Sequence, residues 1–411
     1  MPEPPSPQQP PAPTAEAASI WVPRPAQGYS PAELRAIPPN DVRSLRISKW
    51  DLDTPALCVD LDALERNIAS MQERATRNGI AVRPHAKSHK CAAIARLQLE
   101  AGAVGICTAK LSEAEALHAE GIGPICMTTS NPAAGKIRRA MALRKCNPQF
   151  IQAVDEEQNA RELSDAAVEA GVVADVVIDV AVGVRTGIRA GAEAVALAAL
   201  VDRLPNLRLR GLLAYDGGAQ HIRGFAARKA HALAQLEASA RTCELMRAAG
   251  LSTDIFSGGG TGTYSVQHLV PGFTDVQAGS YVFMDMQYLE IGSEDGDATY
   301  TDFAPSLTVV TTVLNNRFPG RLTTDAGAKA VGIDVPRAGV IGEPGMDYDA
   351  GSDEFGVIAF DACARDYRIG DRLELIVPHC DPVVNLYDQI YGIRGDQLEV
   401  IWPVTARGKS Q

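Results

Sequence analysis

Apolar residues recur along the middle of the chain as short runs, and amphipathic stretches separate these runs. The runs are typical of buried strands, and they cover residues 80–82, 104–107, 125–127, 150–154, 176–180, 209–215, 254–257 and 274–278. Stretches rich in Ala, Leu, Glu and Arg lie between most of them, for example 112–120, 156–170 and 192–204. Eight strands separated by helices are the count of a (β/α)8 barrel of the TIM type, while a doubly wound open sheet is the competing arrangement. We therefore expect a barrel.

A further strand and helix precede the first of these runs. Residues 56–59 form a short apolar run, and Asp62 offers a helix N-cap with Glu65 three residues on, as in a capping box. Apolar residues then follow at helical spacing until Gly79, which predicts the end of the helix. The early strand, or the residues 48–53 before it, can pair either with the barrel or with the C-terminal part of the chain, and the pattern leaves this open.

The pattern of predicted elements changes after Gln287, from alternating strands and helices to strands alone. Strand-like runs at 309–313, 357–360, 372–377 and 398–402 are separated by Gly, Asp and Pro turns, with almost no helical periodicity. We expect an α/β barrel over 54–288 and an all-β domain over 289–405, with 48–60 as a segment that can join them. Residues 1–47 form a Pro-rich extension with few large apolar side chains, which predicts partial disorder, with Trp21 and Tyr29 as candidates for docking.

Composition and charge limit the kinds of binding partner and the cellular compartment that we expect for the protein. The net charge of −11 argues against nucleic acid, because phosphate binding needs a cationic face. No apolar run approaches the roughly 20 residues that span a bilayer. The N-terminus lacks the basic start and apolar core that are typical of a signal peptide, so we expect none. The eight cysteines include no C-x-x-C pair, and several lie in apolar runs. We therefore expect a cytoplasmic protein in a reducing compartment, without membrane or nucleic-acid partners.

The run from Arg83 to Lys90 carries the first candidate chemistry. Pro84 cannot donate to a β ladder and ends the strand, so Lys87 is expected on the loop beyond it. A lysine there can form a Schiff base with a carbonyl when nearby cations or apolar walls lower its pKa. A solvated basic turn is the alternative.

A glycine-rich run follows the seventh expected barrel strand. Consecutive glycines let backbone N–H groups approach an anion, and phosphate is often held at this position of a barrel, so Gly259, Gly260 and Thr261 are candidate phosphate contacts. A flexible turn is the alternative. Further polar groups are expected on the same rim, namely Arg185, Tyr215 and Tyr281. Together with Lys87 they fit pyridoxal 5′-phosphate.

The β domain contains a second cluster, Pro378-His379-Cys380-Asp381-Pro382. In a strand, His379 and Asp381 point to the same side and can ligate one divalent cation, while Cys380 faces the other way. An imidazole and a carboxylate suit Mn²⁺, Mg²⁺ or Zn²⁺. A hydrogen-bonded His–Asp pair is the structural alternative.

These motifs together resemble one known family. They are Thr54-Pro55-Ala56-Leu57, the run from Asp60 to Asn67, Arg83-Pro84-His85-Ala86-Lys87, the run from Gly258 to Tyr264, Gln277-Ala278-Gly279-Ser280-Tyr281 and His379-Cys380-Asp381-Pro382. The chain is similar, over roughly residues 54–402, to the D-threonine aldolase/D-serine dehydratase family of alanine-racemase-fold pyridoxal-phosphate enzymes. The resemblance implies Lys87 as the Schiff-base lysine, a divalent metal on His379 and Asp381, and a homodimer.

The resemblance also sets the expected reaction. Aspartate at the second metal position favours the aldolase branch, because members resembling D-serine dehydratase carry cysteine there. We expect metal-assisted cleavage of a D-β-hydroxy-α-amino acid, of the D-threonine or 3-hydroxy-D-aspartate type, to glycine and an aldehyde. The proton acceptor is left open between a metal-bound water, the surroundings of His379, and His85. Ala109 and Asp216 depart from the residues that relatives often carry, so the substrate stays open.

Other activities remain to be weighed against this one. The same family includes dehydratases that act on D-serine or D-threo-3-hydroxyaspartate and release a 2-oxo acid and ammonia. A racemase would need a second base, typically a tyrosine of the β domain, and none is identifiable. A non-catalytic pyridoxal-phosphate carrier has only the barrel, so the β domain argues against it.

Overall fold

The computed structural model describes residues 29–38, 41–296, 298–363 and 365–411. Most of the predicted Pro-rich extension, including Trp21, lies outside the described residues. Tyr29 is described, and its backbone N–H donates to the carbonyl of Asp51 at 3.0 Å. Beside it, the short helix α1 (Pro31–Arg35) begins with a Ser30 capping box and buries Leu34. The end of the extension therefore packs on the body of the protein.

The predicted barrel is confirmed. Its strands form a parallel sheet, β2 (Ala81–Val82), β3 (Ile106–Thr108), β4 (Ile125–Met127), β5 (Ile151–Val154), β6 (Ala174–Asp179), β7 (Leu207–Ala214), β8 (Ile255–Gly258) and β9 (Asp275–Val276). The order runs β2-β9-β8-β7-β6-β5-β4-β3, and a bridge between His85 and Cys107 joins the two ends. This closure rules out the open sheet.

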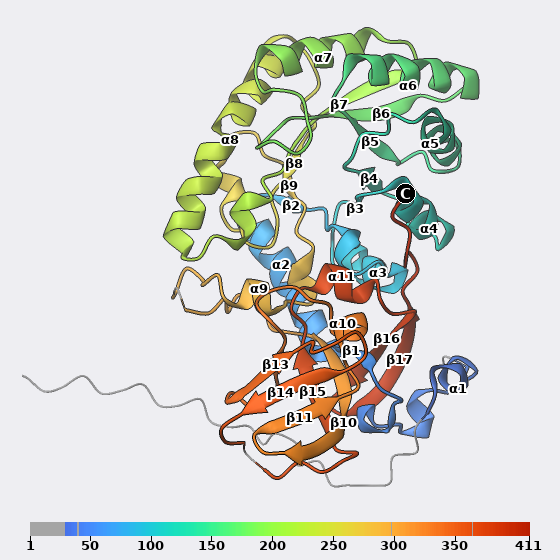
Figure 1. The fold of residues 1–411 in the computed structure, drawn as a ribbon. Coiled ribbons are helices and arrows are strands. Elements are labelled where there is room, and N and C mark those ends of the chain that lie inside the picture. Colours follow the sequence, from blue (N-terminus) through green and yellow to red (C-terminus); the bar gives the residue numbers. More distant parts are fainter. Residues whose placement is uncertain (1–28, 39–40, 297, 364) are drawn as a thin grey trace, which may run out of the picture.

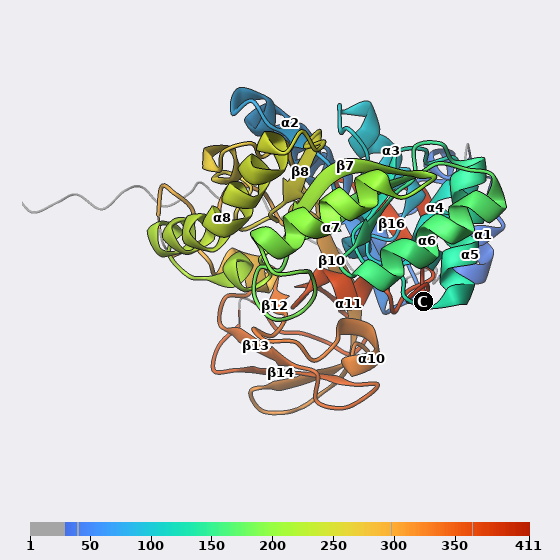
Figure 2. The same cartoon turned by 90° about the horizontal axis from the view of Figure 1, so that it is seen from above.

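Helices surround the strands, as Figure 2 shows from above. They are α2 (Leu61–Arg77), α3 (Ala92–Glu100), α4 (Leu111–Ala119), α5 (Ala134–Cys146), α6 (Glu157–Ala170), α7 (Ala192–Arg203) and α8 (Phe225–Ala248). The predicted N-cap of α2 was wrong by two residues: Asp60, not Asp62, accepts from the N–H of Ala63 at 2.9 Å. The carboxylate of Asp62 instead forms an ion pair with Arg394 of the β domain, so it does not cap the helix.

The second domain is built from β1 (Ala56–Asp60), β10 (Leu307–Phe318), β11 (Arg321–Thr324), β12 (Gly339–Val340), β13 (Met346–Asp349), β14 (Gly356–Phe360), β15 (Arg372–Ile376), β16 (Gln389–Arg394) and β17 (Gln397–Pro403). Strand β11 pairs with β10 as well as β14, which curls part of this sheet into a small barrel. The early strand β1 lies between β10 and β16. It therefore belongs to the β sheet and not to the (β/α)8 barrel.

Three further short helices are α9 (Met286–Leu289), α10 (Ala328–Val331) and α11 (Cys380–Val384). Figure 1 shows α11 between the barrel and the β sheet, and it contacts the short 3-10 helix η3 (Ala86–Ser88) that carries Lys87. One hydrophobic core runs through this junction, from Leu57 of β1 to Tyr281 and Val384. The junction is thus packed from both domains, and the Lys87 loop lies on it.

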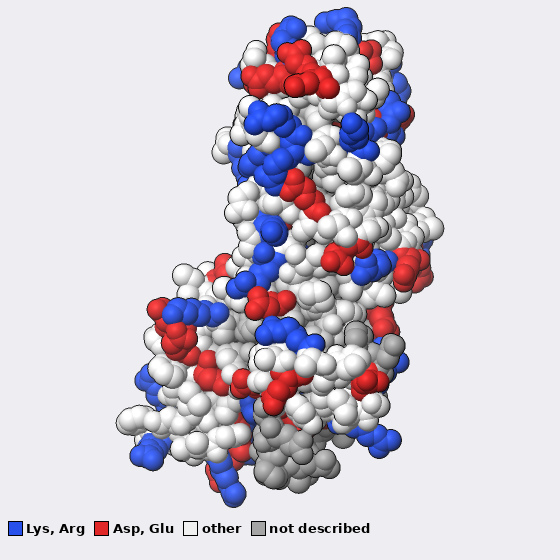
Figure 3. All heavy atoms as spheres, turned by 90° about the vertical axis from the view of Figure 1, so that its right-hand side faces the viewer, with Lys and Arg blue, Asp and Glu red and all other residues white. Residues whose placement is uncertain are grey.

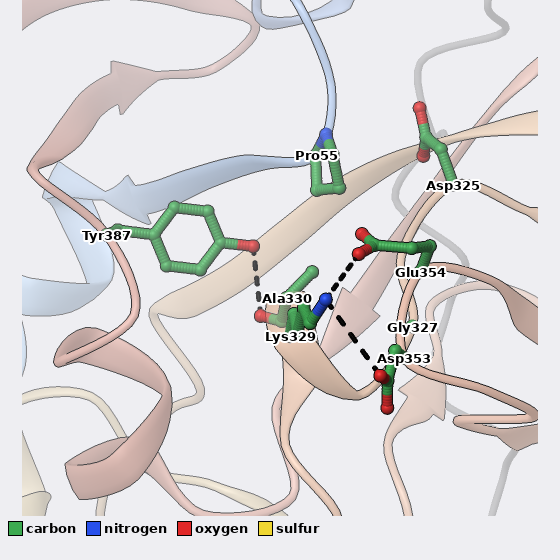
Figure 4. A pocket seen from close by; sticks show the side chains of 8 residues that line it. All are labelled: Pro55, Asp325, Gly327, Lys329, Ala330, Asp353, Glu354 and Tyr387. Carbon is green, nitrogen blue, oxygen red and sulfur yellow. Dashed lines mark hydrogen bonds and ion pairs between the residues drawn. The ribbon is translucent and has the colours of Figure 1, made fainter.

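The surface carries mixed charges and, on the β domain, a pocket. On the face in Figure 3, acidic and basic side chains are interspersed over both domains. A pocket of about 170 Å³ opens on the β domain and is lined by Pro55, Asp325, Gly327, Lys329, Ala330, Asp353, Glu354 and Tyr387 (Figure 4). Lys329 is ion-paired there with Glu354 at 2.6 Å. Among the described residues, no helix combines the length and apolar character needed to cross a membrane.

Candidate active site

The loop after β2 presents Lys87 at the carboxyl rim of the barrel, as the sequence predicted. The N–H of His85 donates to the carbonyl of Ala278 at 3.0 Å, and the N–H of Cys107 donates to the carbonyl of Pro84 at 2.7 Å. These bonds hold the loop between its two neighbouring strands. Lys87 then occupies the middle of a single 3-10 turn with its side chain partly exposed.

Lys87 reaches across the junction to the β domain. Its ammonium forms an ion pair with the carboxylate of Asp381, the second residue of α11. Burial disfavours both charged groups, but each charge stabilises the other. The net result is a raised pKa for Lys87 and a pKa of about 2 for Asp381, to which the charge of His379 also contributes. The carboxylate of Asp381 is therefore already paired with the ammonium of Lys87 in this structure.

His379 and Asp381 converge as predicted, but not by the predicted route. They do not lie on a strand: His379 is extended and precedes α11 as its N-cap, and Asp381 lies within the helix. The Nδ1 atom of His379 hydrogen-bonds to the buried carboxylate of Asp285 at 3.0 Å. Despite its burial, His379 has a raised pKa because this carboxylate, and then Asp381, stabilise its charged form.

Two residues at this junction were missed from the sequence, Asp285 and His221. The ring of His221 lies 6.4 Å from that of His379 in an edge-on arrangement and 4.6 Å from that of Tyr288, measured between centroids. Burial lowers the pKa of His221, although part of the residue is exposed to solvent. Its position on η4 (Gly218–His221), after the β7 strand, is the signal that could have pointed to it.

His85 lies beneath the Lys87 loop and is buried. Its Nδ1 accepts from the N–H of Lys87 at 3.3 Å, and its Nε2 lies 3.4 Å from the hydroxyl of Thr128. Burial, and then the neighbouring charge of Lys87, lower its pKa to about 3. His85 is therefore neutral near pH 7, and both ring nitrogens have protein partners.

The glycine loop after β8 is tightly built around Gln220. The side-chain oxygen of Gln220 accepts from the N–H of Gly262 at 3.0 Å, and its amide donates to the hydroxyl of Thr263 at 3.2 Å. A Cβ atom on Gly260 would lie 2.6 Å from that oxygen, and a Cβ on Gly262 would collide with the backbone carbonyl of Gln220. The glycines are thus required by close packing, and the loop is more than a flexible turn.

The other predicted cofactor residues occupy the same end of the barrel. Thr261 accepts from the backbone N–H of Tyr281 at 3.0 Å, which joins the glycine loop to the loop after β9. The Tyr281 phenol lies in the core and accepts from Gln98 at 3.0 Å. Arg185 lies over the ring of Tyr215, with Cζ 5.4 Å from the centroid, and the charges of Lys87 and Asp381 both act on that phenol.

This arrangement fits both implied groups. For a phosphorylated cofactor it supplies a lysine amine, a glycine loop where Cβ atoms have no room, and a buried Thr108 hydroxyl without a partner among the described residues, at the end of β3. For a divalent cation it supplies the Asp381 carboxylate and the Nε2 atom of His379. Both donor types suit Mn²⁺, Mg²⁺ or Zn²⁺.

Comparison with known proteins supports this assignment at the level of family. The family described as "Alanine racemase, N-terminal domain" matches residues 59–287, and "Putative serine dehydratase domain" matches residues 306–393. A 3-hydroxy-D-aspartate aldolase of Paracoccus denitrificans (strain Pd 1222) is 34% identical over 87% of this chain and 93% of its own. A D-threonine aldolase of an Arthrobacter species is 37% identical over 88% of this chain and 94% of its own.

A solved structure agrees with both matches. The D-threonine aldolase from Filomicrobium marinum superposes with a TM-score of 0.85 at 35% identity, covering 89% of this chain and 99% of that one. The resemblance found in the sequence motifs is thereby confirmed. The chain therefore belongs to the family that joins an alanine racemase N-terminal domain to a D-serine dehydratase-like domain, the family of the D-threonine and 3-hydroxy-D-aspartate aldolases.

Proposed function

We propose that this protein is a pyridoxal-phosphate- and divalent-metal-dependent aldolase that cleaves D-β-hydroxy-α-amino acids to glycine and an aldehyde. Its substrates are of the D-threonine or 3-hydroxy-D-aspartate type. The observation that carries the proposal is the meeting of Asp381 with Lys87 beside His379, which supplies an oxygen and a nitrogen ligand next to the cofactor lysine. The homodimer that the family implies stays a prediction.

Each part of the cofactor has its own residues in this proposal. Lys87 supplies the amine that binds the cofactor aldehyde. Gly259, Gly260 and Thr261 would receive the phosphate, and Tyr215, with Arg185 lying over its ring, would line the cofactor ring. When bound, pyridoxal phosphate accepts the electron pair that bond cleavage leaves on the substrate Cα.

The β domain supplies the group that distinguishes an aldol cleavage from other reactions of this fold. His379 and Asp381 would hold the cation close to Lys87. A divalent cation acidifies the hydroxyl group that it coordinates. The carboxylate of Asp285 accepts from His379 Nδ1 and from the N–H of Cys380.

We propose His221 as the proton acceptor. Cleavage breaks the Cα–Cβ bond: the β-hydroxyl loses its proton, the Cβ–O bond becomes a carbonyl, and Cα later gains a proton to give glycine. His221 is partly exposed, packs at a tilt against Tyr288 and lies close to His379, so a free ring nitrogen can take the hydroxyl proton. His85 was predicted as a catalytic residue, but both of its ring nitrogens have protein partners below the loop. We therefore propose that His85 supports the loop that carries Lys87 and does not accept the proton.

The alternative activity is dehydration to a 2-oxo acid and ammonia. It is favoured by the serine dehydratase-like match over residues 306–393. The same cofactor serves both reactions, but dehydration expels the hydroxyl and keeps the Cα–Cβ bond. The products therefore separate the two activities.

The test is one assay of the cofactor-loaded enzyme with D-threonine, 3-hydroxy-D-aspartate and D-serine, with and without EDTA. We expect glycine with acetaldehyde or glyoxylate, and loss of cleavage in EDTA or in Asp381→Ala while the cofactor absorbance persists. Asp366→Ala, an exposed carboxylate of the β domain, is the matched control. Full cleavage in metal-free enzyme contradicts the metal's role, and pyruvate or oxaloacetate as the main product supports the dehydratase.

A further inference from the structure

Two overlapping sets of side chains can hold a cation at the domain junction. Asp285, His379 and Cys380 have ligand atoms that all lie within 4.8 Å of one another. His379 and Asp381 form the other set, which the proposed function uses. The two sets share His379 but require opposite nitrogens of its ring, because Nδ1 faces Asp285.

The oxygens of Asp285 are already engaged with protein donors. One oxygen accepts from His379 Nδ1 at 3.0 Å and from the N–H of Cys380 at 2.9 Å. The other accepts from the N–H of Tyr288 at 3.0 Å, which caps α9. Asp285 is fully buried, so a cation bound there would leave these buried N–H groups without their acceptor.

The same contacts fix the tautomer of His379. A carboxylate can only accept, so the Nδ1 of His379 carries a proton, and when the ring is neutral its Nε2 has the free lone pair. Metal-binding histidines typically donate their second nitrogen to a carboxylate in this way, which orients the ring. Asp285 comes from the segment that leaves the barrel, while His379 comes from the β domain.

We propose that Asp285 is a positioning residue that locks His379 with Nε2 toward the metal, and that Asp285 and Cys380 are not ligands. This inference rests on the metal site of the proposed function. It also links the two short helices at the domain junction, because Asp285 accepts from N–H groups in the first turns of both α9 and α11.

The variant Asp285→Asn tests the role of the carboxylate with little change in shape. An asparagine has one acceptor and one donor where the structure needs two acceptors. Either its NH₂ faces His379 and selects the Nε2–H tautomer, or it faces the Tyr288 N–H and disturbs the cap. In serine proteases, whose triad is the established example, the same exchange selects the wrong histidine tautomer.

The first experiment measures Mn²⁺ affinity by calorimetry in the cofactor-loaded protein, for the wild type, Asp285→Asn and Cys380→Ala. We expect Asp285→Asn to lose about 10- to 100-fold in affinity. We expect Cys380→Ala to bind like the wild type. Loss of binding in Cys380→Ala, or unchanged binding in Asp285→Asn, overturns the proposal. A wild type that binds no Mn²⁺ refutes instead the metal site of the proposed function.

The second experiment needs neither the metal nor a stable Asp285 variant. In metal-free wild type with ¹⁵N-labelled histidine, the His379 signals are identified by their loss in His379→Gln. At about pH 9, where a neutral imidazole is expected, the proposal predicts the Nδ1–H tautomer. An Nε2–H tautomer in the wild type overturns the proposal even if the Mn²⁺ data agree with it.

Discussion

The ammonium of Lys87 and the carboxylate of Asp381 form an ion pair that links the barrel to the β domain. The lysine expected to bind the cofactor and the aspartate expected to bind the metal thus hold each other in the unloaded protein. A cation that binds Asp381 has to compete with this ammonium. Cofactor and metal binding are therefore expected to assist each other, because cofactor binding engages the lysine amine.

We predict that Lys87→Ala raises the Mn²⁺ affinity of the cofactor-free protein by about tenfold, equivalent to about 1.4 kcal/mol, because the competing charge is gone. Calorimetric titration of the dialysed proteins measures this. Lys110→Ala removes an exposed lysine from the neighbouring rim loop and should leave the affinity unchanged. Weaker Mn²⁺ binding in Lys87→Ala would argue that Asp381 is not a ligand.

The glycine loop provides a second prediction, about stability. Gly262→Ala should lower the melting temperature more than Gly260→Ala, because its Cβ meets the backbone of Gln220 whereas the Cβ of Gly260 meets only side-chain atoms. Overpacking of this kind costs roughly 1–3 kcal/mol. Thermal melts of the cofactor-free proteins measure the difference. Gly135→Ala in α5, where a Cβ would contact only the end of the Arg138 side chain at 4.0 Å, is the control and should be neutral or slightly stabilising.

The barrel could be predicted from sequence because parallel strands are buried on both faces and appear as continuous apolar runs. All the expected runs between residues 80 and 278 became strands. The small β domain was harder. The pair β12 and β13 is short, and β1 joins this sheet although the barrel helix α2 follows it directly. Which sheet accepts such a strand depends on distant partners that the local pattern does not contain.

The candidate site was predictable where the chemistry is local and not where it depends on tertiary contacts. Lys87, His379 and Asp381 stood out by residue type and spacing. His379 and Asp381 converge because a helix begins at Cys380, and Pro382 suits the first turn of a helix, so strand alternation was the wrong geometry. Asp285 was missed, although a carboxylate directly after the apolar run of residues 281–284 must find partners when buried.

The buried imidazole of His89 predicts acid sensitivity. Burial lowers its pKa to about 4, below its ordinary value of 6.5, so the unfolded chain gains the proton first as pH falls. Its contribution is fully present above about pH 6.5 and is lost towards pH 4, at up to about 1.4 kcal/mol per pH unit. Denaturant unfolding at pH 7 and pH 5 should show a steeper loss in the wild type than in His89→Asn.

Asparagine is chosen there because its side-chain oxygen can still accept from the N–H of Cys91, as His89 Nδ1 does at 3.1 Å. The comparison of two slopes also removes other titrating groups. Burial raises the pKa of Asp179 to about 6, which acts in the opposite direction but is common to both proteins. Equal slopes would mean that His89 is charged in the folded protein.

The last prediction concerns the proton acceptor. His221→Phe keeps a ring that can pack against Tyr288 but removes both nitrogens. We expect kcat for cleavage to fall by about 10²- to 10⁴-fold, the usual contribution of a general base, while cofactor absorbance and Mn²⁺ affinity stay near the wild-type values. His231→Phe, a partly exposed histidine of α8 that pairs with Asp216, is the matched control and should keep its kcat. Because His221 also adjoins His379, a variant that loses Mn²⁺ in proportion to its activity would make His221 a metal contact instead. A variant with wild-type kcat would return the proton-accepting role to a metal-bound water or to His85.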